Sequence, residues 1–107
     1  MSEPVLDMSE IVELYKIDAR TMIQTMQADL QKWQNGTPMD DMAKELRRLS
    51  HQLRGSGRTY GFRHVTRLGK AIEKIVLKLE AHRLSWDEPV RQSLAKKIEQ
   101  LKLAFQS

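Results

Sequence analysis

Hydrophobic residues recur every three or four positions in four separate stretches of the chain, with polar residues between them. This spacing places the apolar side chains on one face of an α-helix, so each stretch predicts an amphipathic helix. The four apolar series are Val12, Tyr15, Ala19, Met22, Met26, Leu30, Trp33; Met42, Leu46, Leu49, Leu53; Val65, Leu68, Ile72, Ile75, Val76, Leu79; and Leu94, Ile98, Leu101, Phe105. No strand pattern competes with them. The sequence therefore predicts an all-α fold.

Capping residues and helix breakers mark the predicted helix ends. Asp7 or Ser9 can cap the first helix, and Asn-Gly-Thr-Pro at 35–38 ends it before a second helix over 40–58. The third helix is expected from about residue 62 to residue 83. A capping box at 85–88, Ser-Trp-Asp-Glu, predicts the start of the fourth. Short connections favour an antiparallel up-down four-helix bundle. Residues 1–7 form a short N-terminal lead-in, in which Val5 and Leu6 can cover the open end of the core.

Length and composition exclude several classes of protein. A chain of 107 residues predicts a single domain, 1–107, with one modest core. The absence of cysteine excludes disulfides and thiolate metal sites. No apolar run approaches the ~20 residues that a membrane-spanning helix needs, and the first residues lack the layout of a secretory signal. We therefore expect a cytoplasmic protein without a membrane partner. A bundle whose apolar faces are sealed against one another is expected to be a monomer.

Positive charge is concentrated in one part of the chain. Seven basic residues and no Asp or Glu lie between Leu46 and Ile72, and the remaining 11 basic residues accompany 14 acidic ones. The seven are Arg47, Arg48, Arg54, Arg58, Arg63, Arg67 and Lys70. Such a patch attracts an anionic partner and speeds its approach.

His51 lies away from the apolar face of the second predicted helix. It is two residues from both Leu49 and Leu53, so its side chain is expected in solvent. Gly55 follows one turn later on the same face, where a bare backbone leaves the imidazole open. Glycine inside a helix costs roughly 1 kcal/mol, so Gly55 and Gly57 indicate that something approaches the backbone closely.

Four arginines are expected around this histidine. Arg47, Arg48, Arg54 and Arg58 lie at positions −4, −3, +3 and +7 from it. Neighbouring cations disfavour the imidazolium form and keep a nitrogen lone pair available. An exposed imidazole in a ring of guanidinium groups can hold a phosphoryl group.

The segment that begins at His51 resembles the histidine-containing phosphotransfer (HPt) domain of phosphorelay signalling. The family motif runs roughly His-x-Leu-Lys-Gly-Ser, then Gly at +10 and an apolar residue at +14. The matching positions are His51, Leu53, Arg54, Gly55, Ser56, Gly61 and Val65, with Leu68, Ile72 and Glu73 continuing the pattern. Arg54 replaces the usual lysine, Gly57 stands where a small side chain is common, and Gly69 where alanine or cysteine is frequent.

The resemblance implies a phosphorelay carrier. Nε2 of His51 would accept a phosphoryl group from the aspartyl phosphate of a response-regulator receiver domain, or of the receiver of a hybrid histidine kinase. It would then pass the group to another receiver, or back. The chain has no Gly-rich nucleotide loop, so we expect no phosphorylation from ATP. We expect no cofactor on this chain. The resemblance implies that the Mg²⁺ needed for such transfers is bound in the acidic pocket of the receiver.

Two sets of site residues follow. The predicted catalytic residues are His51, which is phosphorylated, Arg54 and Gly55. The predicted phosphoryl- or partner-binding residues are Arg47, Arg48, Ser56, Arg58, Tyr60, Gly61 and Lys70. In docking, Leu53, Tyr60 and Phe62 would supply apolar contacts. His64 and His82 are expected to be ordinary surface residues, and Trp33 and Trp86 to pack at helix ends. Three scattered histidines do not predict a metal site.

Two other interpretations stay open at this point. A non-catalytic HPt-like adaptor would dock on a receiver and regulate it by occupancy alone. A nucleic-acid-binding domain would account for the basic segment, but few base-reading side chains accompany it and no helix-turn-helix pattern is present. We therefore expect no nucleic-acid partner.

Overall fold

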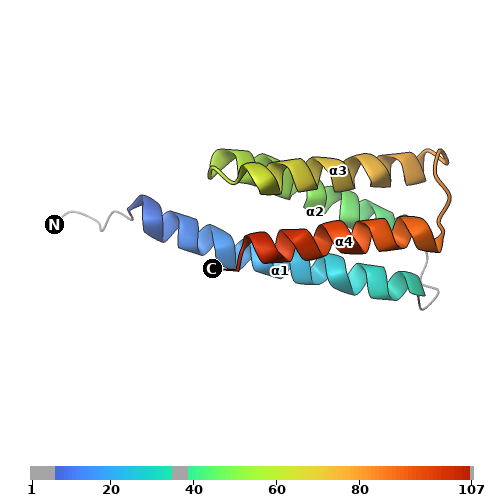
Figure 1. Cartoon of the computed structure of the whole chain (residues 1–107), viewed down its shortest axis with the longest axis horizontal. Helices are drawn as coiled ribbons and strands as arrows, with labels where there is room; N and C mark the ends of the chain where they lie inside the picture. Colours follow the sequence, from blue (N-terminus) through green and yellow to red (C-terminus); the bar gives the residue numbers. More distant parts are fainter. Residues whose placement is uncertain (1–6, 35–38, 107) are drawn as a thin grey trace.

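Four helices make up the part of the chain that the computed structural model describes, residues 7–34 and 39–106 (Figure 1). They are α1 (Met8–Gln34), α2 (Met39–Thr59), α3 (Arg63–Glu80) and α4 (Glu88–Ala104). No strand occurs within the described ranges, which confirms the all-α prediction. The predicted lead-in contacts of Val5 and Leu6 and the breaker at 35–38 lie outside the described residues.

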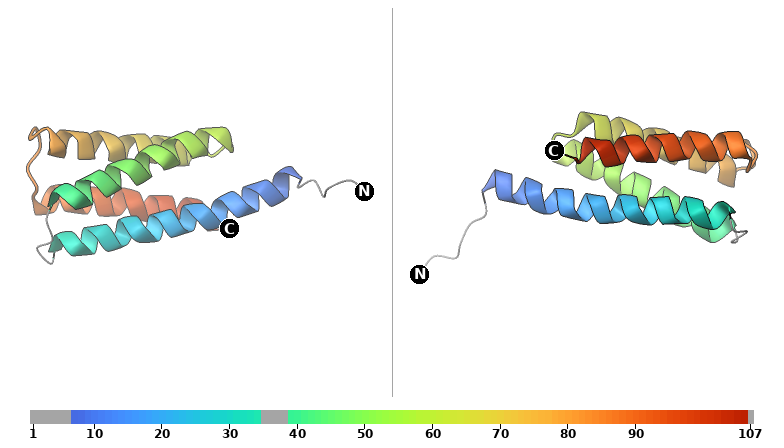
Figure 2. Two further views of the ribbon diagram at one scale, coloured as in Figure 1. Left: turned by 180° about the vertical axis from the view of Figure 1, so that it is seen from behind. Right: turned by 60° about the horizontal axis from the view of Figure 1, so that its bottom comes forward.

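Each helix packs against the next one in the chain, and α4 packs back against α1 (Figures 1 and 2). The α2–α3 pair has the most extensive contact. Residue pairs between these two helices run in opposite order, since His51 contacts Glu73 whereas the earlier Arg47 contacts the later Glu80. None of the described helices is long and apolar enough to cross a bilayer.

The core consists of the predicted apolar faces. Of the four series, Val12, Met22 and Ile75 are partly buried, and all the others are buried. At one end of the bundle, the rings of Trp33 and Trp86 meet edge to face with centroids 5.0 Å apart. This confirms their predicted packing at helix ends.

The helix ends agree with the sequence in one case and correct it in two. Asp7 caps α1, because its Oδ1 accepts a hydrogen bond from the backbone N–H of Glu10 at 2.9 Å. The predicted capping box headed by Ser85 is wrong, since the cap of α4 is Asp87, which accepts from the N–H of Val90 at 3.2 Å. The first side chain in a polar run is not always the one that caps.

The third helix ends at Glu80 and not at residue 83. His82 adopts a left-handed backbone conformation with φ of 58°. The N–H groups of Arg83 and Leu84 then both point back to the carbonyl of Lys78, at 2.8 and 3.3 Å. These bonds satisfy the open end of α3 in the way that a C-terminal glycine usually permits.

Two glycines let α2 and α3 approach each other closely. A Cβ at Gly69 would lie 2.8 Å from the backbone N of Arg54 and 2.9 Å from the carbonyl O of Ser50. A Cβ at Gly57 would lie 2.9 Å from Oγ1 of Thr66. The predicted close approach at Gly57 is therefore confirmed, and the approaching element is α3 of the same chain. Both glycines that depart from the family pattern have a packing role.

Candidate functional site

His51 stands on the outer face of α2, with 71% of its side chain exposed. Its Nδ1 lies 2.6 Å from Oε2 of Glu73 on α3, and the Glu73 side chain is only 10% exposed. A carboxylate can only accept a hydrogen bond, so Nδ1 is the nitrogen that carries the proton. The lone pair of the neutral ring is then on Nε2.

The second oxygen of Glu73 holds an arginine. Oε1 accepts a hydrogen bond at 2.8 Å from Nη1 of Arg54, one turn after His51. One buried carboxylate therefore positions both the imidazole and the predicted phosphoryl-binding cation. Glu73 belongs to the family pattern in the sequence, but its role as partner of His51 and Arg54 was not predicted. The sequence does contain a signal for this role. Glu73 is an acid next to Ile72 on an apolar helix face, directly after the segment that lacks Asp and Glu.

The four arginines predicted around His51 all line the hollows beside it, and most of them are paired with carboxylates. Arg47 forms an ion pair with Glu80 at 2.8 Å, and Arg48 forms one with Glu45 at 3.7 Å. Of the four arginines predicted around the histidine, Arg58 alone has no carboxylate within ion-pair distance among the described residues. The prediction considered only cations around the ring, whereas the structure also places the Glu73 carboxylate 2.6 Å from Nδ1 of His51.

The imidazole lies in a groove that is open on both sides along the seam of α2 and α3. On one side, the groove is lined by Gly55, Arg58 and Lys70. On the other side, it is lined by Arg47, Gln52, Leu77 and their neighbours. A Cβ at Gly55 would meet no atom within 4 Å. The space over this glycine is therefore free for a molecule from outside.

Three residues predicted to meet a partner are engaged within the bundle. The Ser56 hydroxyl donates a hydrogen bond to the Tyr15 hydroxyl at 3.0 Å, and burial raises the pKa of the Tyr15 phenol. Tyr60 stacks on Tyr15 with ring centroids 4.4 Å apart, and Phe62 lies 5.3 Å from the Phe105 ring. Tyr60 and Phe62 are both partly buried.

The predicted docking role of Leu53 is wrong, because its side chain is fully buried. Leu77 is the apolar residue that lines the groove beside His51, and it is 48% exposed. It was missed because it lies outside the apolar series of α3. Its exposure depends on how α2 and α3 pack, which the spacing of a single helix does not contain.

The remaining predicted positions are on the surface or in a turn. Gly61 joins α2 to α3 with φ of +81°, a conformation that favours glycine. His64 and His82 are exposed, as expected, and neither lines the groove around His51. Within residues 7–34 and 39–106, no group of three or more His, Asp or Glu side chains lies close enough to hold a metal ion.

Comparison with known protein families agrees with this arrangement. The family model for the Hpt domain matches residues 10–104. The match covers nearly all of the chain, so the chain belongs to the Hpt domain family, whose members carry out histidine phosphotransfer in two-component phosphorelays and interact with receiver domains. Searches of curated proteins and of solved structures found no match to this chain.

Proposed function

We propose that Nε2 of His51 accepts a phosphoryl group from the aspartyl phosphate of a receiver domain and passes it to a second receiver, or back to the first. The observation that carries this proposal is the exposed imidazole whose Nδ1 is fixed by the buried Glu73. The antiparallel up-down bundle predicted from the sequence is the scaffold, because α2 and α3 must hold the two side chains in register. We also propose that the chain acts as a cytoplasmic monomer.

The transfer needs an imidazole with a free lone pair on one nitrogen. The other nitrogen must be held in place by a hydrogen bond. The lone pair of Nε2 attacks phosphorus, the Nε2–P bond forms, and the acyl O–P bond breaks with its electrons leaving on the aspartate carboxylate. The proton on Nδ1 stays in place throughout. Glu73 stabilises the positive charge that develops on the ring as phosphorus binds. The return to a receiver aspartate reverses each of these steps.

Cations beside His51 offset charge on the phosphoryl oxygens. One guanidinium nitrogen of Arg54 is held by Glu73, which leaves its other donors for the phosphoryl group. Lys70 lines the same part of the groove, and Gly55 leaves room for the incoming phosphorus. Positioning and electrostatics supply most of the catalysis in such transfers. The Mg²⁺ would be held by the acidic pocket of the receiver.

Transfer from receivers phosphorylated beforehand with acetyl phosphate tests this proposal. The wild type is compared with His51→Ala and with two matched controls, His64→Ala and His82→Ala. We expect an acid-labile, base-stable phosphate on the wild type and both controls, and none on His51→Ala. Loss of label in a control variant in place of His51→Ala would overturn the assignment. Binding of receivers without any transfer would identify an adaptor.

A further inference from the structure

His51 divides the α2–α3 groove into two halves that differ in charge. In the half toward the start of α2, Arg47 and Arg48 are paired with Glu80 and Glu45. The half toward the α2–α3 turn lies within residues 46–72, a segment that contains no Asp or Glu. Within the described residues, Arg58, Arg63 and Arg67 have no carboxylate within 4.0 Å.

The cationic half is continuous with the imidazole. The hollow beside His51 is lined by Gly55, Arg58, Thr66 and Lys70, among others. The next hollow shares Arg58 and Thr66 with it and extends to Gly61 in the turn. The two hollows are therefore adjacent, and a protein partner that covers His51 can extend over both.

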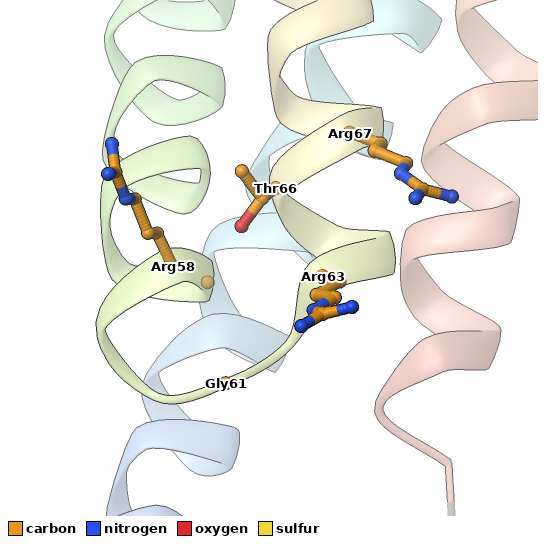
Figure 3. Close-up of a pocket in the computed structure, with 6 residues that line it drawn as sticks. Arg58, Gly61, Arg63, Thr66 and Arg67 are labelled. Carbon is orange, nitrogen blue, oxygen red and sulfur yellow. The ribbon is translucent and has the colours of Figure 1, made fainter.

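The three unpaired guanidinium groups suit a broad anionic surface. Figure 3 shows Arg58 rising from α2 on one side of the hollow, and Arg63 and Arg67 extending from the first turns of α3. The groups spread apart around the hollow and do not converge on one point. Arg63 and Arg67 lie one turn apart on α3 and Arg58 lies on α2, so a protein surface bearing several carboxylates could contact all three.

The other half of the groove offers a different contact. Leu77 is 48% exposed and lines the hollow on the Arg47 side of His51, where carboxylates neutralise the arginines. One side of the phosphoacceptor thus presents three unpaired guanidinium groups, and the other presents the exposed Leu77 between paired arginines, with Lys44 at its margin. Complementary charge fixes the register of a complex and suppresses wrong partners.

We propose that a receiver docks on this groove in one orientation, with a carboxylate-rich rim over Arg58, Arg63 and Arg67 and an apolar patch over Leu77. This inference rests on the proposed function. Arg63 and Arg67 then select the receiver and speed its docking without touching the phosphoryl group. Their removal should raise KM, and salt should weaken the effect, because ions screen exposed charges.

The test compares Arg63→Gln/Arg67→Gln with a matched control, Lys96→Gln/Lys102→Gln, which removes two exposed charges from α4. The substrate is a phosphorylated receiver that labels the wild type. We expect KM of the Arg63/Arg67 variant to rise about tenfold at low salt and less than about threefold at ~0.5 M salt, with kcat within about twofold. Leu77→Ser should raise KM by a similar factor at both salt concentrations.

Two results for the Arg63/Arg67 variant would overturn the inference while leaving the proposed function intact. One is a change in KM no larger than that of the control variant, and the other is a change in KM that is the same at both salt concentrations. If no receiver binds or labels the wild type, the proposed function itself fails. In that case, salt-sensitive binding of duplex DNA by the wild type but not by the Arg63/Arg67 variant would assign the cationic half to nucleic acid and overturn the inference as well.

Discussion

The Nδ1 atom of His51 lies 2.6 Å from Oε2 of Glu73, a mostly buried acid on the neighbouring helix. This contact joins the two helices of the site and fixes which ring nitrogen is free. Because the other Glu73 oxygen holds Arg54, one carboxylate organises both the nucleophile and the adjacent cation.

Substitution of Glu73 should slow phosphoryl transfer in proportion to the loss of this contact. Glu73→Gln keeps an oxygen that can accept the Nδ1 proton, so we expect a loss of about tenfold, and Glu73→Ala should lose about a hundredfold. Glu80→Gln is the matched control, because it breaks an ion pair of the same helix pair away from the ring. Quenched-flow transfer rates, with ¹⁵N chemical shifts of the His51 ring, measure both effects. Equal rates for all variants would contradict the role of Glu73.

Alanine at two glycines of the site should have opposite effects on stability. A Cβ at Gly69 would lie against the backbone of α2 at 2.8 to 3.1 Å, so Gly69→Ala should destabilise the fold by about 1–3 kcal/mol. A Cβ at Gly55 has open space, so Gly55→Ala should stabilise α2 by about 0.5–1 kcal/mol. Urea unfolding measures both. A stabilising Gly69→Ala would show that the two helices do not pack as closely as described.

The loop after α3 contains a residue whose backbone conformation favours glycine. His82 has φ of 58°, so His82→Gly should raise the free energy of unfolding by about 0.5–1 kcal/mol, since glycine adopts this conformation without strain. His64→Gly is the control, because His64 is an exposed residue inside α3 and glycine there should lower stability by up to about 1 kcal/mol. Thermal or urea unfolding should give opposite signs for the two variants.

A buried acid makes stability depend on pH. Burial is the main cause that raises the pKa of Asp29 from 3.8 to about 6, and the neighbouring Glu45 carboxyl adds to it. Oδ2 of Asp29 has no hydrogen-bond partner among the described residues, and Lys32 lies 3.8 Å from Oδ1. The folded state therefore binds a proton more tightly than the unfolded state, so this group lowers stability as pH rises from about 4 through about 6.

Replacement of Asp29 by asparagine tests this dependence. At pH 8, Asp29→Asn should be more stable than the wild type by about 1–2 kcal/mol, because it removes a buried charge. The difference should shrink toward pH 4, where the wild-type carboxyl is protonated. Unfolding in urea at several pH values measures it. A difference that grows as pH falls would contradict the assignment.

The periodicity of apolar residues predicted the four helices and nearly the whole core, because a helix face is a local property of sequence. The position of His51 on the outer face followed from the same argument. Side-chain contacts between different helices could not be predicted from this periodicity. The register of α3 against α2 determines that Arg47 pairs with Glu80 and Arg54 with Glu73. It also determines that Leu77 is exposed. That register is set by the close packing at Gly57 and Gly69, whose effect a single helix pattern does not contain.

The atom that carries the phosphate in the labelled protein shows whether Nε2 of His51 is the nucleophile. The chain is phosphorylated by a receiver, with its histidines ¹⁵N-labelled, and the phosphorus–nitrogen couplings identify the modified atom. We expect a single phosphorylated nitrogen, Nε2 of His51, with the proton retained on Nδ1. Phosphate on Nδ1 of His51, or on His64 or His82, would contradict it.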